Sequence, residues 1–191
     1  MGKWILLIVF VVTAVVMFFA MPSYINNDTE KKRKYKNLRN DDIESIPDEE
    51  LESAIVEWLF SKLDEKGTTE VPVMRAMPKP CRNIYACYIV SGEVISEGFG
   101  KCFEYINSYL LASAIEGFID MGAEELATIT EQACGVAGKY IAENGRKNMA
   151  LLNDDETLRE LTRKFEESDD TLKLSGTVVD YIRKNRDYFG D

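Results

Sequence analysis

The sequence predicts an all-α protein, in which a single amino-terminal transmembrane helix precedes a compact acidic domain of about six or seven helices. Two observations predict this class. An unbroken apolar run opens the chain, and beyond it apolar residues recur at helical spacing without a convincing run of alternating strands. We expect residues 1–22 to be a signal anchor, residues 23–44 a basic polar stalk and residues 45–191 the helical domain.

The apolar run extends from Trp4 to Met21 and is interrupted only by Thr13. As a helix, its 18 residues would span roughly 27 Å, close to the ~30 Å hydrocarbon core of a bilayer. A cleaved secretory signal is the alternative. The run is longer than the roughly 7–15 apolar residues of such signals, and no small-x-small cleavage pattern follows it. We therefore expect an uncleaved anchor in the lipid bilayer.

Basic residues follow the apolar run closely, whereas Lys3 alone precedes it. Because basic flanks remain in the cytoplasm, we expect a single-pass protein of the inner cell membrane with a cytoplasmic carboxyl-terminal domain. The basic cluster either contacts anionic lipid headgroups as well or serves only as a topology signal, and the two roles are compatible. Its members are Lys31, Lys32, Arg33, Lys34 and Lys36.

The first helix of the domain is expected to start around Pro47, where acidic residues face the positive end of the helix dipole. Gly67 ends it, and the three prolines of Thr68–Pro80 predict a loop. Helical spacing is evident in the apolar residues Leu51, Ala54, Ile55, Trp58, Leu59 and Leu63.

The glycine-rich segment Ser91–Gly100 is expected to be a turn region between a buried helix over Cys81–Val90 and a shorter helix that begins at Cys102. A clear 3.6-residue pattern then predicts a helix over Ser108–Met121, which Gly122 breaks.

Three further helices are expected in the carboxyl-terminal part: an alanine-rich one over Glu124–Ala142, one over Asp154–Glu167 and one over Leu174–Phe189. Asp154-Asp155-Glu156 is typical of a helix start. The acidic run Glu166–Asp170 is interpreted as a solvated linker.

The chemistry that the chain can perform is limited, because it contains no histidine. Ser-His and Cys-His catalysis and most metal sites are thereby excluded. No P-loop or calcium-loop motif occurs, and Gly98-Phe99-Gly100 is better interpreted as a turn than as a phosphate cradle. We expect neither a cofactor nor a metal. Four cysteines without a C-x-x-C pair are interpreted as buried reduced thiols rather than disulfides: Cys81, Cys87, Cys102 and Cys134.

Acidic residues dominate the domain, since residues 45–191 carry 28 acidic and 16 basic residues, a net charge of −12. This charge disfavours direct contact with nucleic acid and suits a basic protein partner, although solubility alone would also explain it. Residues 83–138 contain eight acidic residues and a single basic residue, Lys101. The expected partner-binding acidic face comprises Glu93, Glu97, Glu104, Glu116, Asp120 and Glu124.

Residues 77–137 resemble a bacterial domain family, otherwise of unknown function, typified by DNA mimic protein 19. The resemblance rests on the segment Ser91–Phe103, on the later segment Glu116–Ala127 and on a closing segment, Tyr181–Phe189. The family-like part then extends over about residues 77–191. Ile95, Ser96 and Glu97 replace two asparagines and a glycine of the family pattern. The resemblance implies an all-α, acidic domain that imitates duplex phosphate and occupies a DNA-binding protein.

These observations predict a membrane-anchored, non-enzymatic interaction protein whose acidic domain binds a basic protein surface, with a DNA-binding protein as the candidate partner. An immunity or inhibitor protein, stationed at the inner membrane against a basic toxin or nuclease, is the alternative. The enzymatic alternative is a carboxylate-dependent hydrolase. Glu93 and Glu97 are four residues apart and would share a helix face, but solvated surface acids are the simpler interpretation.

Overall fold

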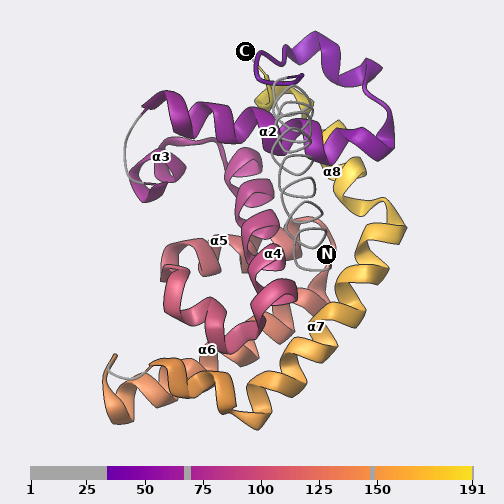
Figure 1. Ribbon diagram of the computed structural model, residues 1–191. Helices are drawn as coiled ribbons and strands as arrows, with labels where there is room; N and C mark the ends of the chain where they lie inside the picture. Colours follow the sequence, from indigo (N-terminus) through magenta and orange to yellow (C-terminus); the bar gives the residue numbers. More distant parts are fainter. Residues whose placement is uncertain (1–33, 67–69, 147–148, 191) are drawn as a thin grey trace, which may run out of the picture.

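The computed structural model describes residues 34–66, 70–146 and 149–190, and these residues form helices and connecting turns without any strand. The predicted all-α class is confirmed (Figure 1). Short 3-10 helices are η1 (Asn40–Ser45), η2 (Met149–Asp154) and η3 (Arg186–Tyr188). The α-helices are α2 (Asp48–Lys66), α3 (Glu70–Ala76), α4 (Lys79–Tyr105), α5 (Ser108–Asp120), α6 (Glu124–Asn144), α7 (Glu156–Ser175) and α8 (Thr177–Lys184).

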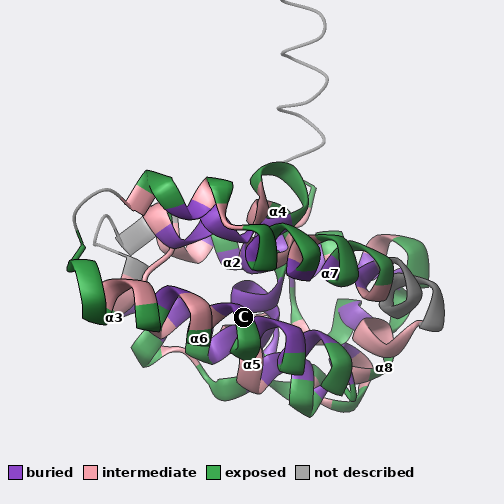
Figure 2. Ribbon diagram, turned by 90° about the horizontal axis from the view of Figure 1, so that it is seen from below, coloured by how far each residue is buried: buried purple, intermediate pink, exposed green. Residues whose placement is uncertain are grey.

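Helix α4 is the centre of the fold and packs against α5, α7 and η2 (Figure 1). Helix α6 packs against both α5 and α7, so these four helices surround one core. Figure 2 shows the buried positions on the inner faces of the helices and the exposed positions on their outer faces. This is the arrangement that the 3.6-residue apolar pattern predicts.

Three phenylalanines join α4, α5 and α7 at the middle of the core. Phe99, Phe118 and Phe165 are fully buried. The ring of Phe165 meets those of Phe99 and Phe118 edge to face, at centroid distances of 5.4 and 5.9 Å. Such aromatic pairs contribute roughly 0.5–1.5 kcal/mol beyond the burial of their area. The core therefore fixes how α4 lies against α7.

The expected turn over Ser91–Gly100 is wrong, because α4 continues through it. Val90 and Val94, four positions apart, are both fully buried, so the apolar helical period passes over Gly92 without interruption. Only Gly98 leaves the helical conformation, with φ 81° and ψ 164°. The segment is thus a kinked helix rather than a loop between two helices.

Two further segments differ from the prediction. Residues expected in a proline-rich loop form α3, in which Pro72 occupies the first turn, where a missing N–H removes no hydrogen bond. The acidic run Glu166–Asp170 belongs to α7, and Asp169 is buried, so the predicted linker is wrong. The helix predicted from Cys102 is part of α4, and the remaining predicted helices are present with shifted ends, by as many as eight residues at the end of α7.

The packed structure begins before Ser45, because the described part of the expected stalk contacts the domain. Leu38 and Ile43 are buried, and the ammonium group of Lys34 lies 2.7 Å from a carboxylate oxygen of Glu50. Arg183 of α8 donates hydrogen bonds to the backbone carbonyls of Ile43 and Ile46. Lys31, Lys32 and Arg33 lie outside the described residues.

The predicted inner-membrane localisation requires correction. Among the described residues, none of the helices is both long enough and apolar enough to cross a bilayer. This finding contradicts the expectation of a single-pass protein of the inner membrane. The apolar run Trp4–Met21 and its assignment as an anchor lie outside the described residues.

Candidate functional site

The six residues of the expected acidic face do not form one row. Glu93, Glu97 and Glu104 lie on the second half of α4, whereas the carboxylates of α5 contact its first turns. About 14 helical positions separate residues 83 and 97, which is roughly 21 Å. Glu124 begins α6, beyond the turn at Gly122, whose φ is +78°. The expected face is therefore divided into separate groups: one on the second half of α4, one beside the first turns of α4, and Glu124 at the start of α6.

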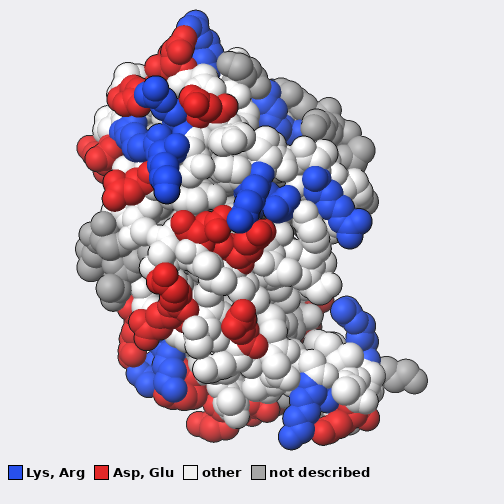
Figure 3. Space-filling model, turned by 180° about the vertical axis from the view of Figure 1, so that it is seen from behind, with Lys and Arg blue, Asp and Glu red and all other residues white. Residues whose placement is uncertain are grey.

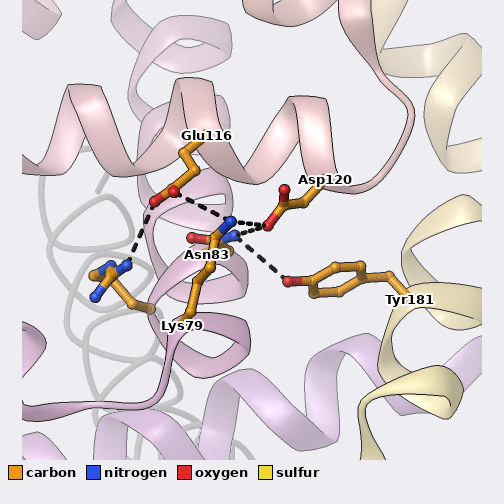
Figure 4. Close-up of polar contacts among 6 residues, drawn as sticks. Lys79, Asn83, Glu116, Asp120 and Tyr181 are labelled. Carbon is orange, nitrogen blue, oxygen red and sulfur yellow. Dashed lines mark hydrogen bonds and ion pairs between the residues drawn. The ribbon is translucent and has the colours of Figure 1, made fainter.

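The α5 carboxylates are neutralised by cations of α4, as Figure 4 shows. The ammonium group of Lys79 lies 3.1 Å from Glu116 Oε1 and 2.8 Å from Asp120 Oδ2, and Arg82 Nη2 lies 3.4 Å from Glu116 Oε2. Hydrogen bonds to Asp120 and Glu116 raise the pKa of Lys79. Lys79 and Arg82 precede residue 83, so the charge count over residues 83–138 omitted them.

Asn83 anchors the same cluster inside the protein. Its side chain is fully buried, and Nδ2 donates to Asp120 Oδ2 at 2.9 Å and to the hydroxyl of Tyr181 at 3.4 Å (Figure 4). Burial raises the pKa of Tyr181. These bonds tie α4, α5 and α8 together, so Glu116 and Asp120 have a structural role in this region.

A groove with a volume of about 650 Å³ lies at the kink of α4. We call it the kink groove. Its walls are residues 95–101 of α4, Leu152 and Asn153 of η2, and the α7 side chains Leu158, Arg159, Thr162, Arg163 and Glu166. The segment Ser91–Phe103, on which the resemblance to a known family rests, therefore supplies one wall.

The two glycines of the kink have different roles. Gly98 adopts a positive φ that side-chain-bearing residues rarely adopt. At Gly100 the backbone of η2 comes so close that a Cβ atom would lie 2.6 Å from the carbonyl oxygen of Leu152. Between them, Phe99 enters the core, and its N–H donates to Thr162 Oγ1 at 3.1 Å. The kink is thus held by contacts with η2 and α7.

Every cation that lines the kink groove contacts carboxylates of the same chain. Lys101 lies 3.2 Å from Glu104, and Glu104 also accepts a hydrogen bond from Asn153 at 3.0 Å. The hydrogen bond from Asn153 and the Lys101 ammonium group lower the pKa of Glu104. Further pairs join Arg159 to Asp154 and Glu156, and Arg163 to Glu160 and Glu167.

The groove and its ion-pair partners carry a negative net charge. Glu97 and Glu166, which also line the groove, form no ion pair within the part of the chain that the structure describes. Lys164, which shares Glu160, adds a fourth cation. Seven carboxylates and four cations leave a net charge of −3. The groove therefore attracts cationic groups and repels anions.

The two groove carboxylates that are unpaired in the described structure lack the buried setting of a general acid. Glu97 and Glu166 are both exposed. A carboxyl that acts as a general acid near neutral pH needs an apolar, buried setting that raises its pKa. Within residues 34–66, 70–146 and 149–190, no group of three His, Cys, Asp or Glu side chains is placed to hold a metal ion.

The α7 side of this groove was not predicted from the sequence. Glu97 belongs to the expected binding face, whereas Glu166 lies in the expected linker, and Arg159, Thr162 and Arg163 lie outside every expected site. Continued helical spacing through Leu158, Leu161 and Phe165, all buried, could have indicated that α7 presents an opposite face here.

A family model described as DMP19-like protein matches residues 75–185, more than half of the chain. This range extends from the end of α3 to the end of α8 and contains the whole kink groove. No curated protein matches the chain, and no solved structure does.

Proposed function

The chain belongs to the DMP19-like protein family, and from that membership we propose that it is a non-enzymatic protein whose acidic helical domain binds the basic surface of a partner protein. The partner in this proposal is a DNA-binding protein, and the acidic domain takes the place of duplex phosphate. DNA-binding proteins present Lys and Arg side chains to the charged backbone of DNA, so carboxylates at their surface can compete with it.

The observation that carries the proposal is an excess of carboxylates over cations. In addition, many of the cations already form ion pairs with carboxylates of the same chain. Residues 45–191 have a net charge of −12. Figure 3 shows basic side chains beside acidic ones on one face of the molecule. Among the described residues, cations that form ion pairs include Lys34, Lys79, Arg82, Lys101, Arg159, Arg163, Lys164, Arg183 and Arg186.

Part of the expected acidic face supports this proposal better than the rest. Glu93, Glu97 and Glu124 form no ion pair among the described residues, so their charge is available to a partner. Glu104, Glu116 and Asp120 are paired with cations of the same chain and contribute mainly to the structure. On α6, Glu124 is accompanied by the exposed carboxylates of Glu125 and Glu131.

The alternative of an immunity or inhibitor protein assumed that the protein is located at the inner membrane. That localisation is contradicted, so this alternative has no separate support. A nuclease with a basic surface would still be recognised by the same carboxylates, and isolation of the partner distinguishes it from a DNA-binding regulator.

The test is to immobilise the protein, capture binders from a cell extract and elute them with a salt gradient. A basic partner held by charge should be retained near 50 mM salt and released by about 500 mM. Over this interval the Debye length, beyond which surface charges no longer attract each other appreciably, falls from roughly 14 to 4 Å. Duplex DNA should also displace it. Retention that is insensitive to salt would contradict the proposal. So would a partner that binds duplex DNA and this protein at the same time, because the two should compete for one surface.

A further inference from the structure

We propose that the kink groove receives a Lys or Arg side chain from a basic segment of the partner protein, with Glu97 and Glu166 as its counterions. This inference rests on the proposed function and assigns its point of contact. The two carboxylates come from different helices, α4 and α7, and both line the groove.

Charge complementarity identifies the occupant. Lys101, Arg159 and Arg163 line the groove, but each contacts at least one carboxylate of its own chain. An anionic ligand would have to displace these partners. A cationic ligand meets Glu97 and Glu166, which form no ion pair in the described structure, and needs no such displacement. Charge-assisted hydrogen bonds from ammonium or guanidinium groups to carboxylates are about twice as strong as neutral ones.

The groove also suits the aliphatic stem of a long basic side chain. Ile95 lines the groove and is 41% exposed, so it offers apolar surface to a ligand. Leu152 and Leu158 contribute to the wall from below and are buried. Lys and Arg side chains lay their methylene groups on apolar surface while the charged head reaches polar groups. Ile95 and the two carboxylates thus provide both parts of such a site.

The wall on the α4 side is held in place before any partner arrives. Phe99 donates its N–H to Thr162, and Gly100 lies against the backbone of η2. The backbone that carries Ile95, Ser96 and Glu97 therefore leads directly into a fixed kink. A preorganised wall lowers the entropic cost of binding.

The test uses a fluorescein-labelled deca-arginine peptide and fluorescence anisotropy at fixed, low salt. The double variant Glu97→Gln/Glu166→Gln removes both groove charges while keeping the size of the side chains. Its matched control is Glu49→Gln/Glu143→Gln, which removes two exposed charges, on α2 and α6, and changes the net charge equally. We expect at least a tenfold loss of affinity for the groove variant and less than a threefold loss for the control.

A second pair of variants tests the position by size rather than by charge. Ser96 lines the groove and is exposed, so Ser96→Trp should obstruct it without disturbing the core. Thr128→Trp, at an exposed position of α6, is the control. Ser96→Trp should weaken peptide binding at least fivefold, and circular dichroism should show that both variants remain helical.

The outcomes separate the two proposals. If both charge variants lose affinity equally and Ser96→Trp binds as the wild type does, the groove assignment is overturned, while salt-dependent capture of a basic partner would still support the proposed function. If the wild type does not bind the cationic peptide, the groove assignment is again overturned. Failure of the extract experiment to yield a salt-sensitive partner would overturn the proposed function itself.

Discussion

The N–H of Phe99 donates a hydrogen bond to Thr162 Oγ1, so the break in α4 is closed by a side chain of α7. The kink leaves Phe99 without its normal helical acceptor, and Thr162 supplies the replacement. Thr162 in turn donates to the carbonyl of Leu158. This bond connects residues 63 positions apart and sets the distance between the two long walls of the kink groove.

Thr162→Val should destabilise the protein by about 1–3 kcal/mol, because it leaves the Phe99 N–H unsatisfied in a partly buried place. Thr162→Ser retains the hydroxyl and should lose less than about 1 kcal/mol. Urea denaturation followed by circular dichroism measures both values. Equal stability of the valine variant and the wild type would show that the bond does not hold the kink.

Gly100→Ala should cost about 1–3 kcal/mol of unfolding free energy, because its Cβ atom would lie 2.6 Å from the Leu152 carbonyl oxygen, and backbone cannot easily move aside. Gly135→Ala on α6 is the control, since a Cβ atom there meets nothing within 4 Å. That variant should be more stable by about 0.5–1 kcal/mol. If both substitutions stabilise the protein, the close approach of η2 is not rigid.

Glu104 should make stability depend on pH. The hydrogen bond from Asn153 and the ammonium group of Lys101 lower its pKa in the folded state. A lowered pKa contributes stability that is complete above the ordinary glutamate value, roughly 4.3, and is lost as the pH falls through the lowered folded-state value. The stability difference between wild type and Glu104→Gln should therefore be present at pH 7 and shrink below about pH 4. A difference that does not change between pH 7 and pH 3 would refute this assignment.

The cysteine thiols should react slowly in the folded protein. All four are free, as the sequence predicted, and three of them are buried. Burial raises the pKa of Cys81 and of Cys102 to about 12, and it also raises those of Cys87 and Cys134. Thiolate is the reactive form, so Ellman's reagent at pH 8 should label the half-buried Cys134 first. Cys134→Ser should abolish the fastest phase, and a fast phase that persists would indicate that another thiol becomes exposed.

Local pattern predicted most of the fold, and contacts between distant segments determined what it missed. A helix over Ser108–Met121 was predicted because its apolar period is strong and Gly122 follows it, and α5 ends one residue earlier, at Asp120. A turn was predicted over the whole of Ser91–Gly100, because only contacts with Thr162 and η2 confine the break in the helix to Gly98. No local pattern carries that information.

The candidate site was predicted in part for the same reason. Glu97 was recognised as an available carboxylate, but the pairing of Glu116 with Lys79 and Arg82 connects two helices and is invisible in a linear charge count. Glu166 was missed because an acidic run is also typical of a linker. Its place on α7 follows from the burial of Phe165 and Asp169 on either side of it.

The bonds from Arg183 to the start of the described fold have a consequence for biosynthesis. The guanidinium of Arg183 donates to the Ile46 carbonyl at 2.7 Å and to Asp48 at 2.6 Å, across 137 and 135 positions. A nascent chain cannot make these contacts until α8 has left the ribosome. Until then, η1 and the apolar face of α2 lack their final cover and are open to chaperones or to aggregation.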